Sequence, residues 1–342
     1  MSSKKAAVYF SAGIGDALLL IPLIKILKKD GYQVFGIFTS PFQVHELFES
    51  NEVLDEKIVV LNQPRKIWFT GKYFFNKFDL SIVNYFAASK SNLLMASKTS
   101  LKVNTNRNVF FKRIKLKNIE LKEPKINIHD AEQNINLYSE NHQLTESDFT
   151  LTSNKSFSNH FKNKIAIQIG AGNNKTPFKI WSSDKWIQLM EKICSDYPDT
   201  QLLLIGDKHE GLLVKHLNHK NVTNLIGKTT LNELPSIISD STCFIGSDSG
   251  IMHLAVALGL PTFTIWGASS ELLYGYHNLN AVKHQVVFNE SVNCRPCNAW
   301  INPNISRVKD VNQCPDFKCI AEIEVKDIYS KLKLFLSHHL QN

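Results

Sequence analysis

The stretch AAVYFSAGIGDALLLIPLIKILKKDGYQVFGIF, residues 6–38, predicts the fold of this chain. Its first five residues form an apolar run typical of a buried strand, and the turn at 11–16 contains two glycines. Residues 17–29 predict a helix that Gly31 ends, and a second apolar run at 33–38 predicts another strand. Strand–helix–strand units build parallel sheets covered by helices, so the N-terminal part of the chain is expected to be α/β.

The same pattern begins again in the second half of the chain. Residues 164–169 predict a strand, and Gly170-Ala171-Gly172 supplies a second glycine turn before a helix expected at 186–194. Further strands are expected at 58–61, 80–83, 201–205, 242–245 and 262–266, and further helices at 231–238, 251–258 and 325–339.

The fold class is therefore α/β with two Rossmann-like lobes. The Ser- and Asn-rich segment 151–163 is the expected linker. Since ligands of open α/β sheets bind beyond the carboxyl ends of the strands, the expected site is a central cleft between the lobes. The expected boundaries are 1–155 for the N-terminal lobe, 156–321 for the C-terminal lobe, and 322–342 for a C-terminal helix that packs back on the N-terminal lobe.

Length and composition exclude several classes of protein. The 342 residues correspond to two domains at about 100–200 residues per domain. A hydrophobic fraction of 43% with 20% charged residues excludes disordered, collagen-like and small disulfide-rich proteins. No apolar run approaches the roughly 18 residues of a membrane span, and the longest, at 17–27, contains Pro22 and Lys25. That run lacks the cleavage site of a signal peptide, so the expected compartment is the cytoplasm.

The net charge of +8 is concentrated in one segment. Residues 57–125 contain 15 Lys and Arg and three acidic residues. A basic face on one lobe indicates an acidic partner, which could be nucleic acid, an anionic membrane surface or a phosphorylated substrate. The alternative is a Lys-rich composition whose lysines are simply solvated.

The first glycine turn argues against a nicotinamide cofactor. Gly13 and Gly15 let the backbone approach a ligand at a helix N-terminus. The dinucleotide fingerprint needs a third glycine where Leu18 stands, and an acidic residue at the end of the second strand, where residues 38–40 are Phe-Thr-Ser. By position alone, Asp16 is a dipole-compatible cap of the first helical turn.

The stretch KTPFKIW, residues 175–181, follows the second glycine turn. Lysines such as Lys179, with Thr176 beside backbone N–H groups, suit a diphosphate, and a cation there would stabilise a phosphate leaving group without a metal. The alternative is a pair of exposed loop lysines and a core tryptophan. No Asp-x-Asp pair occurs in the sequence, so a metal–diphosphate site built on that pair is absent.

The stretch GSDSGIMH, residues 246–253, leads from a strand into a helix. Its middle residue is Asp248, where a nucleophile elbow would have serine. A turn of small residues at a helix start suits a polar or anionic ligand, with Asp248 as a ligand of sugar hydroxyls. His253 is more typical of a buried, hydrogen-bonded histidine than of an acid or base.

Four cysteines near the C-terminus have the spacing of a zinc knuckle. Cys294-x2-Cys297 and Cys314-x4-Cys319 could together hold a structural zinc ion. Free or transiently oxidised thiols are the alternative, because stable disulfides are rare in the cytoplasm.

Together these motifs resemble the heptosyltransferase family of glycosyltransferases (family 9), which has the GT-B fold. The resemblance covers nearly the whole chain, and the Cys-x2-Cys pair also resembles a common feature of the family. The matching segments are 12–16 with Leu18-Leu19, 129–134 with Leu137, 170–171 with 179–181, 225–229 with Leu231 and Glu233-Leu234, and, most specific, 247–255 with 257–261.

The resemblance implies an inverting, metal-independent transfer in which Asp16 is the general base on the acceptor hydroxyl. Lys179 would neutralise the departing diphosphate, and no cofactor would be needed for catalysis. Glu210 would bind the nucleotide ribose and Asp248 the sugar. The substrate-binding residues implied are Gly13, Gly15, Thr176, Glu210, Thr229, Asp248, Ser249, Gly250 and His253.

The partners implied are a nucleotide-sugar donor, with ADP-heptose favoured, and a phosphorylated lipopolysaccharide-type acceptor at the anionic inner face of the membrane. Ser182 and Ile251 stand where the family often has proline, and Asn173-Asn174 replaces a bulkier residue. These departures leave UDP- or GDP-linked hexose or N-acetylhexosamine donors open. A GT-B-like nucleotide-sugar epimerase is a further alternative. The remaining alternative is a nucleic-acid-binding protein, which no nucleic-acid motif in the sequence supports.

Overall fold

The computed structural model describes most of the chain, and the chain divides into two compact units, Met1–Thr152 and Ser153–Asn342. The described residues are 3–40, 42–49, 51–60, 77–107, 118–125, 127–140, 142–151, 163–172, 176–214, 219–297 and 314–340.

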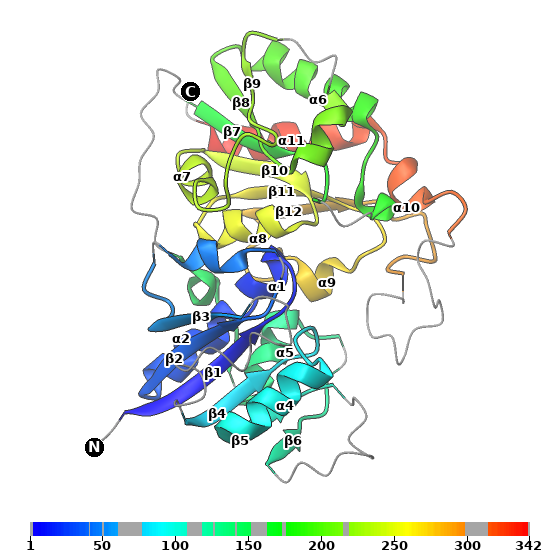
Figure 1. Cartoon of the computed structure of the whole chain (residues 1–342). Helices are drawn as coiled ribbons and strands as arrows, with labels where there is room; N and C mark the ends of the chain where they lie inside the picture. Colours follow the sequence, from blue (N-terminus) through cyan, green and yellow to red (C-terminus); the bar gives the residue numbers. More distant parts are fainter. Residues whose placement is uncertain are drawn as a thin grey trace. The chain divides into compact units, whose positions relative to one another are not determined.

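The N-terminal unit is built on a six-stranded parallel sheet (Figure 1). The strand order is β3-β2-β1-β4-β5-β6, the Rossmann order with the first strand inside the sheet. β1 pairs with β2 along its whole length, from Lys4 opposite Tyr32 to Phe10 opposite Phe38. The strands are β1 (Lys4–Phe10), β2 (Tyr32–Phe38), β3 (Glu56–Val59), β4 (Phe78–Val83), β5 (Ser100–Thr105) and β6 (Ile119–Leu121).

The prediction of one helix at 17–29 is wrong, because this segment forms two helices, α1 (Ile14–Leu18) and α2 (Ile21–Lys29). Pro22 explains the break, since it has no N–H to donate and its ring would collide with the carbonyl of Leu18 in a continuous helix. Gly31, at φ +84°, ends α2 as expected. The other helical segments of this unit are η1 (Val44–Phe48), α4 (Lys90–Thr99), α5 (Asp130–Asn136) and η3 (Glu146–Phe149).

The C-terminal unit repeats the same architecture. Its parallel sheet has the order β12-β11-β10-β7-β8-β9, which is the Rossmann order again, with β7 in the role of the first strand. The predicted strand at 262–266 is confirmed residue for residue. The strands are β7 (Asn163–Gln168), β8 (Thr200–Leu204), β9 (Val222–Asn224), β10 (Cys243–Ser247), β11 (Thr262–Trp266) and β12 (His284–Phe288).

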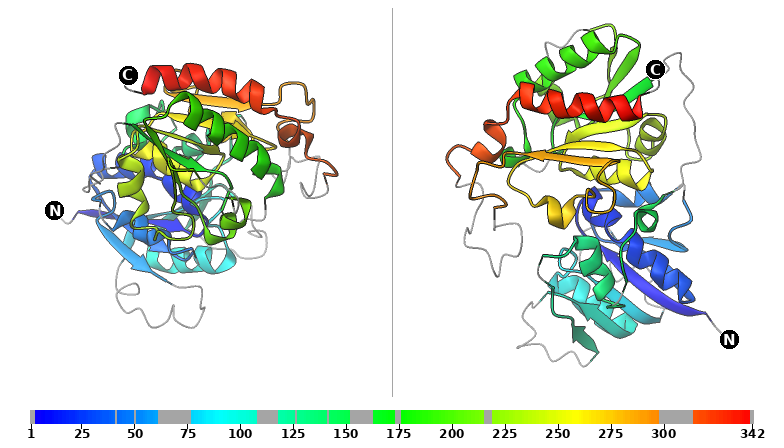
Figure 2. Two further views of the ribbon diagram at one scale, coloured as in Figure 1. Left: turned by 90° about the horizontal axis from the view of Figure 1, so that it is seen from above. Right: turned by 180° about the vertical axis from the view of Figure 1, so that it is seen from behind.

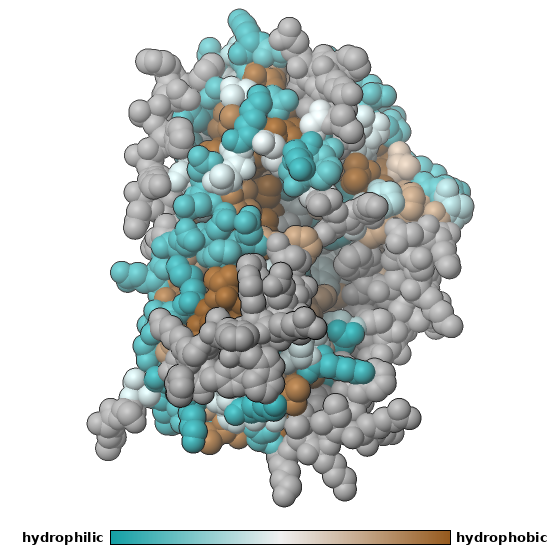
Figure 3. Space-filling view, in the orientation of Figure 1, coloured by the Kyte–Doolittle hydropathy of each residue, from teal (hydrophilic) through white to brown (hydrophobic). Residues whose placement is uncertain are grey.

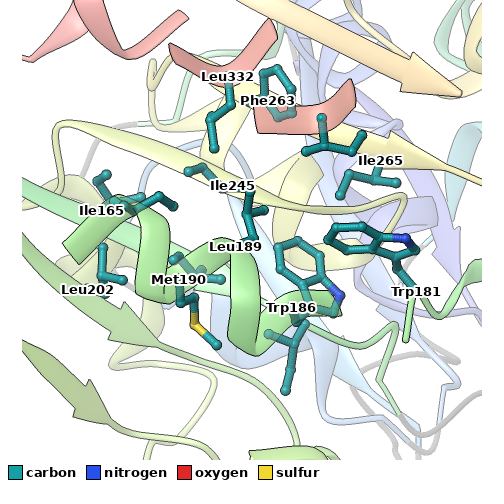
Figure 4. Close-up of a cluster of buried hydrophobic side chains, with 14 of the residues drawn as sticks. Ile165, Trp181, Trp186, Leu189, Met190, Leu202, Ile245, Phe263, Ile265 and Leu332 are labelled. Carbon is teal, nitrogen blue, oxygen red and sulfur yellow. The ribbon is translucent and has the colours of Figure 1, made fainter. Parts of the chain in front are cut away.

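Two tryptophans anchor the core of the C-terminal unit (Figure 4). The rings of Trp181 and Trp186 meet edge to face with centroids 5.3 Å apart, and both side chains are fully buried. The indole N–H of Trp181 donates to the carbonyl of Ile323 at 2.9 Å, which satisfies its one polar group. The helical segments of this unit are η4 (Pro177–Lys179), α6 (Ser183–Asp196), η5 (Lys208–Val214), α7 (Leu234–Ser239), α8 (Gly250–Ala257), α9 (Glu271–Tyr274), α10 (Lys318–Ala321) and α11 (Val325–His339).

The C-terminal helix α11 has the predicted bounds and packs on the sheet of its own unit. Its buried side chains, which include Leu332 and Phe335, join the core formed by β7, β8, β10, β11 and α6 of its own unit. Phe335 packs against Phe263 of β11, and Figure 2 shows the red helix alongside the strands of this sheet. The apolar face of α11 is thus buried within its own unit, and the expectation that residues 322–342 pack back on the N-terminal lobe stays a prediction.

None of the helices in the described parts of the chain combines the length and the hydropathy that a membrane span requires. On the face drawn in Figure 3, hydrophilic side chains are interspersed with hydrophobic ones. Much of the basic segment 57–125, most of the expected linker, and residues 173–175 lie outside the described residues, so the expectations placed on them stay predictions.

Candidate functional site

Both sheets have a topological switch point, where the strand order reverses between neighbouring strands. It lies between β1 and β4 in the N-terminal unit and between β7 and β10 in the C-terminal unit. Ligands of doubly wound sheets bind at the carboxyl ends of these strands. The segments that follow these strands contain most of the residues that the sequence singles out.

Asp16 lies in the first turn of α1, directly after β1. Its Oδ2 accepts a hydrogen bond from the N–H of Gly13, the N-cap residue, at 3.1 Å, and Gly15 is the second residue of the helix. This is the capping contact that position alone predicts. A carboxylate has further lone pairs, and Asp16 also lines a small recess with residues from the ends of β1 and β4, among them Ser11 and Asn84. The capping contact and contact with a ligand are therefore compatible.

A second carboxyl group, which the sequence analysis does not single out, lies close to Asp16. Asp130 is the first residue of α5, and its Oδ2 is buried without a hydrogen-bond partner. Asn134 fixes α5 in place, because its amide donates to the carbonyl of Leu19 at 3.1 Å and accepts from Asn84 at 3.0 Å. Burial, together with the nearby charge of Asp16, raises the pKa of Asp130 to about 7.

In the C-terminal unit, Glu210 lies between two glycine turns. A Cβ on Gly170 or on Gly206 would come within 2.7 or 2.8 Å of the carboxyl carbon of Glu210, so neither position has room for a side chain. Glu210 Oε1 accepts from the N–H of Gly172 at 2.8 Å, while Oε2 is buried without a hydrogen-bond partner. Burial raises the pKa of Glu210, and hydrogen bonds, that from Gln168 foremost, partly offset the rise.

Ser249 caps the N-terminus of α8 beside this carboxylate. Its hydroxyl accepts from the N–H of Met252 at 3.2 Å and donates to Oε1 of Gln168 at 2.5 Å. Gly250 is the first residue of α8, so the free N–H groups of the first turn begin there. Gln168, which the sequence analysis missed, has one recognisable signal: it is a polar residue that ends an apolar strand just before the glycine turn.

Lys179 and Asp248 form a largely buried ion pair. Nζ of Lys179 lies 2.6 Å from Oδ2 of Asp248, and the two side chains are 16% and 5% exposed. Burial opposes the charge of Asp248, but the adjacent Lys179, together with His253 and a hydrogen bond with Ser269, outweighs it and holds the pKa of Asp248 below its usual value. The sequence treats these residues as separate ligands of diphosphate and sugar, whereas the structure pairs them at the N-terminus of α8.

His253 is buried in α8, and its Nδ1 lies 2.7 Å from the hydroxyl oxygen of Tyr276. Burial lowers the pKa of His253 to about 4, with Asp248 opposing the shift and Lys179 adding to it. The structure therefore confirms the interpretation of a buried, hydrogen-bonded histidine, and it adds Tyr276 as a partner that the sequence does not reveal.

Two threonines complete the set that the sequence predicts. The hydroxyl oxygen of Thr176, the residue before η4, is buried without a hydrogen-bond partner. Thr229 is half-buried in the loop after β9. The same loop contains Gly227, at φ +68°, whose missing side chain lets it approach the backbone of Lys208 in η5. Glu210 belongs to this same η5 segment, so the loop and the Glu210 cradle lie at the same end of the sheet.

The four C-terminal cysteines are all reduced, and they differ in exposure from the exposed Cys294 to the buried Cys319. Burial raises the pKa of the Cys319 thiol to about 11, and nearby Cys294 and Cys314 add to the rise. Across the described parts of the chain, no three His, Cys, Asp or Glu side chains are arranged to hold a metal ion. The structural zinc site stays a prediction, and elemental analysis of the purified chain tests it.

Two parallel six-stranded units of Rossmann order, each with a polar cluster at its switch point, define the GT-B fold. The sequence model of glycosyltransferase family 9 (heptosyltransferase) matches residues 81–303, about two thirds of the chain. The chain belongs to this family.

Curated relatives match over shorter stretches. The chain is 28% identical over 102 residues to lipopolysaccharide heptosyltransferase 3 of Escherichia coli K12, an alignment that covers 28% of the chain and 29% of the relative. It is 43% identical over 47 residues to lipooligosaccharide heptosyltransferase 2 of Haemophilus influenzae, which covers 14% of each. The chain thus spans less than a third of the length of these two relatives.

Solved structures match over nearly the whole chain and show the fold. The Escherichia coli ADP-heptose LPS heptosyltransferase II superposes with a TM-score of 0.74 at 17% identity, covering 98% of this chain and 99% of that one. A family 9 glycosyl transferase of Veillonella parvula superposes with a TM-score of 0.71 at 16% identity, covering 98% of both chains.

Proposed function

We propose that this chain is an inverting glycosyltransferase that transfers heptose from ADP-heptose to a phosphorylated lipopolysaccharide core acceptor. The observation that carries the proposal is the Lys179 ammonium, held by Asp248 at the N-terminus of α8 beside a switch point. A fixed cation and a helix N-terminus both stabilise the negative charge that a nucleoside diphosphate gains as it leaves. Family membership and the names of the relatives, which include heptosyltransferases, support the same activity.

The C-terminal unit would bind the donor. Backbone N–H groups from Gly250 onward would meet the diphosphate, with Lys179 beside it, while Glu210 would accept from a ribose hydroxyl through its unpartnered Oε2. Asp248 would contact the transferred sugar as well as orient Lys179. The buried hydroxyl of Thr176 would make a further contact with the donor. Thr229, in the loop after β9, would also contact the donor.

The N-terminal unit would bind the acceptor and supply the base. The acceptor hydroxyl attacks the anomeric carbon on the face opposite the diphosphate, so the new C–O bond forms as the bond to ADP breaks and the configuration inverts. Asp16 takes the proton of the attacking hydroxyl. In this step the positive charge that stabilises the leaving diphosphate comes from Lys179, so the proposal requires no metal ion for transfer.

The positive charge of the N-terminal unit supports an anionic acceptor and contact with an anionic membrane face. The 15 basic residues between 57 and 125 complement an acceptor rich in phosphates and carboxylates. We propose that the chain works in the cytoplasm and contacts the anionic inner face of the membrane at its periphery.

A panel of nucleotides tests which donor the chain accepts. Thermal unfolding is measured with ADP, UDP, GDP, CDP and NAD, each well above its expected dissociation constant. A ligand at 100 times its dissociation constant adds about 2.7 kcal/mol of stability, which for a unit of this size is a shift of roughly 5–10 °C. A shift with ADP alone supports ADP-heptose. A shift with UDP or GDP alone supports a glycosyltransferase whose donor is not ADP-heptose. A shift with NAD alone, or no shift with any nucleotide, contradicts the proposal.

A further inference from the structure

Gln168 joins the two polar clusters of the C-terminal unit through hydrogen bonds. It is the last residue of β7 and is 2% exposed. Its Oε1 accepts from the hydroxyl of Ser249 at 2.5 Å, and its Nε2 donates to Oε1 of Glu210 at 3.0 Å. One amide therefore contacts both the cap of α8 and the carboxylate between the glycine turns.

The direction of this chain of hydrogen bonds follows from the chemistry of its ends. An ionised Glu210 can only accept, so Gln168 must turn its NH₂ group toward it and its carbonyl toward Ser249. Ser249 must then donate to Gln168, which leaves a lone pair on its oxygen for the N–H of Met252. The hydrogen bonds from α8 to Glu210 thus have a single consistent orientation, and a change at Gln168 disturbs the contacts at both ends.

Ser249 and Glu210, at the two ends of this series of hydrogen bonds, belong to the nucleotide site of the function proposed above. The inference rests on that proposed function. The α8 end faces the diphosphate, and Glu210 faces the ribose. We propose that Gln168 is a positioning residue that couples these two halves of the nucleotide site, although it touches neither half of the ligand itself. Its amide holds Glu210 Oε1, so that Oε2 stays directed toward a ribose hydroxyl while Ser249 keeps the first turn of α8 in place.

The test is isothermal titration of the full-length chain with two probes, ADP and inorganic pyrophosphate. Gln168→Met keeps the size of the side chain but removes both hydrogen bonds. A hydrogen bond to a charged group contributes enough that its loss weakens binding on the order of tenfold. ADP affinity should therefore fall about tenfold or more. Pyrophosphate meets only the α8 end, where the hydrogen bond from Met252 still holds Ser249, and it should lose less than about threefold. The side chain of Gln168→Asn is too short to reach both partners. This variant should therefore weaken ADP binding and pyrophosphate binding in the same direction as Gln168→Met does.

A matched control is available in the neighbouring strand. Gln201 of β8 is also a buried glutamine, and it donates to the hydroxyl of Thr223 at 2.9 Å, at the opposite end of the sheet from the glycine turns. Gln201→Met should leave ADP and pyrophosphate affinity at the wild-type level. Retained pyrophosphate binding by Gln168→Met also shows that the variant is folded.

A double-mutant cycle adds a readout that a purely structural role would not change. Glu210→Gln should weaken ADP binding in the wild type, and the same substitution should weaken it less in Gln168→Met, because the two residues act as a unit. Unchanged ADP affinity in Gln168→Met, or equal losses of ADP and pyrophosphate, would overturn the role of Gln168. If the wild type itself binds none of ADP, UDP and GDP, the proposed function fails, and the role of Gln168 fails with it.

Discussion

Nζ of Lys179 lies 2.6 Å from Oδ2 of Asp248, although the two residues are far apart in the sequence and both side chains are largely buried. Removing one partner of a buried pair leaves the other charge unpaired, which typically costs about 3–5 kcal/mol. Lys179→Met should therefore lower the unfolding midpoint of the C-terminal unit and abolish transfer.

The double variant Lys179→Met/Asp248→Leu separates stability from activity. Replacing both charges by apolar groups is often neutral or stabilising, so the unfolding midpoint should recover while transfer stays lost. Thermal unfolding and the initial rate of transfer, measured on the same preparations, check this. A Lys179→Met chain that transfers sugar at the wild-type rate would remove Lys179 from the mechanism.

Asp16 is predicted to contribute to transfer and not to donor binding. Asp16→Asn keeps the size of the side chain but removes the base, and general-base contributions are on the order of 10²–10⁴-fold. Transfer should fall by that factor, with ADP affinity unchanged. Asp30→Asn is the control: Asp30 is a carboxylate of the same unit that accepts from the hydroxyl of Tyr138 at 2.7 Å, so its loss should leave transfer intact. Equal rates in Asp16→Asn and wild type would show that Asp16 is not the general base.

Asp130 should make transfer depend on pH near neutrality. Its pKa is raised to about 7, so it is neutral below pH 7 and negative above it. A negative Asp130 raises the proton affinity of the neighbouring Asp16 and makes it a stronger base. The value of kcat/KM should therefore rise through pH 7 in the wild type, and Asp130→Asn should remove that rise. An identical pH profile in the variant would refute the coupling.

The same carboxyl should reduce stability at neutral pH. In the unfolded chain Asp130 ionises near pH 3.8, whereas in the folded chain it keeps its proton to about pH 7. Asp130 therefore makes the free energy of unfolding fall as the pH rises from about 4 to 7. Asp130→Asn should be more stable than the wild type at pH 7 and not at pH 3.5, as chemical denaturation at the two pH values would show.

His253 should make the C-terminal unit sensitive to mild acid. Its pKa is about 4 in the folded chain and 6.5 in the unfolded one, so its contribution to stability is complete above pH 6.5 and is lost as the pH falls toward 4. At about 1.4 kcal/mol per pKa unit the loss amounts to roughly 3 kcal/mol. In His253→Gln the fall in unfolding free energy between pH 6.5 and 4.5 should be smaller. His209→Gln, at an exposed position, should behave like the wild type.

Local sequence was enough to predict most elements of the fold. The strand Thr262–Trp266 and the helix Val325–His339 were predicted with their observed bounds, because one is a short apolar run after Pro261 and the other has clear helical spacing. The break between α1 and α2 was missed although Pro22, the sixth residue of the expected helix, signals it, because the apolar run at 17–27 continues across the break without a glycine. The packing of α11 on the core of its own unit was not predicted, because periodicity shows an apolar face and not what covers it.

The site was predicted in its residue types but not in its pairings. The turns after the parallel strands place Asp16, Glu210 and Asp248 where the sequence predicts polar groups. Contacts across the fold, such as Gln168 with Glu210, depend on strand order, which local patterns do not encode. Asp130 was missed for the same reason, because only the docking of α5 brings it near Asp16.

Transfer of a sugar from ADP-heptose to an acceptor is tested by measuring the release of ADP from ADP-heptose with and without a purified lipopolysaccharide core acceptor. We expect ADP release to depend on the acceptor and to disappear in Asp16→Asn. One heptose should be added to each acceptor, with inversion at the anomeric carbon. Consumption of the donor without an acceptor would indicate an epimerase, and no consumption under either condition would contradict the donor assignment.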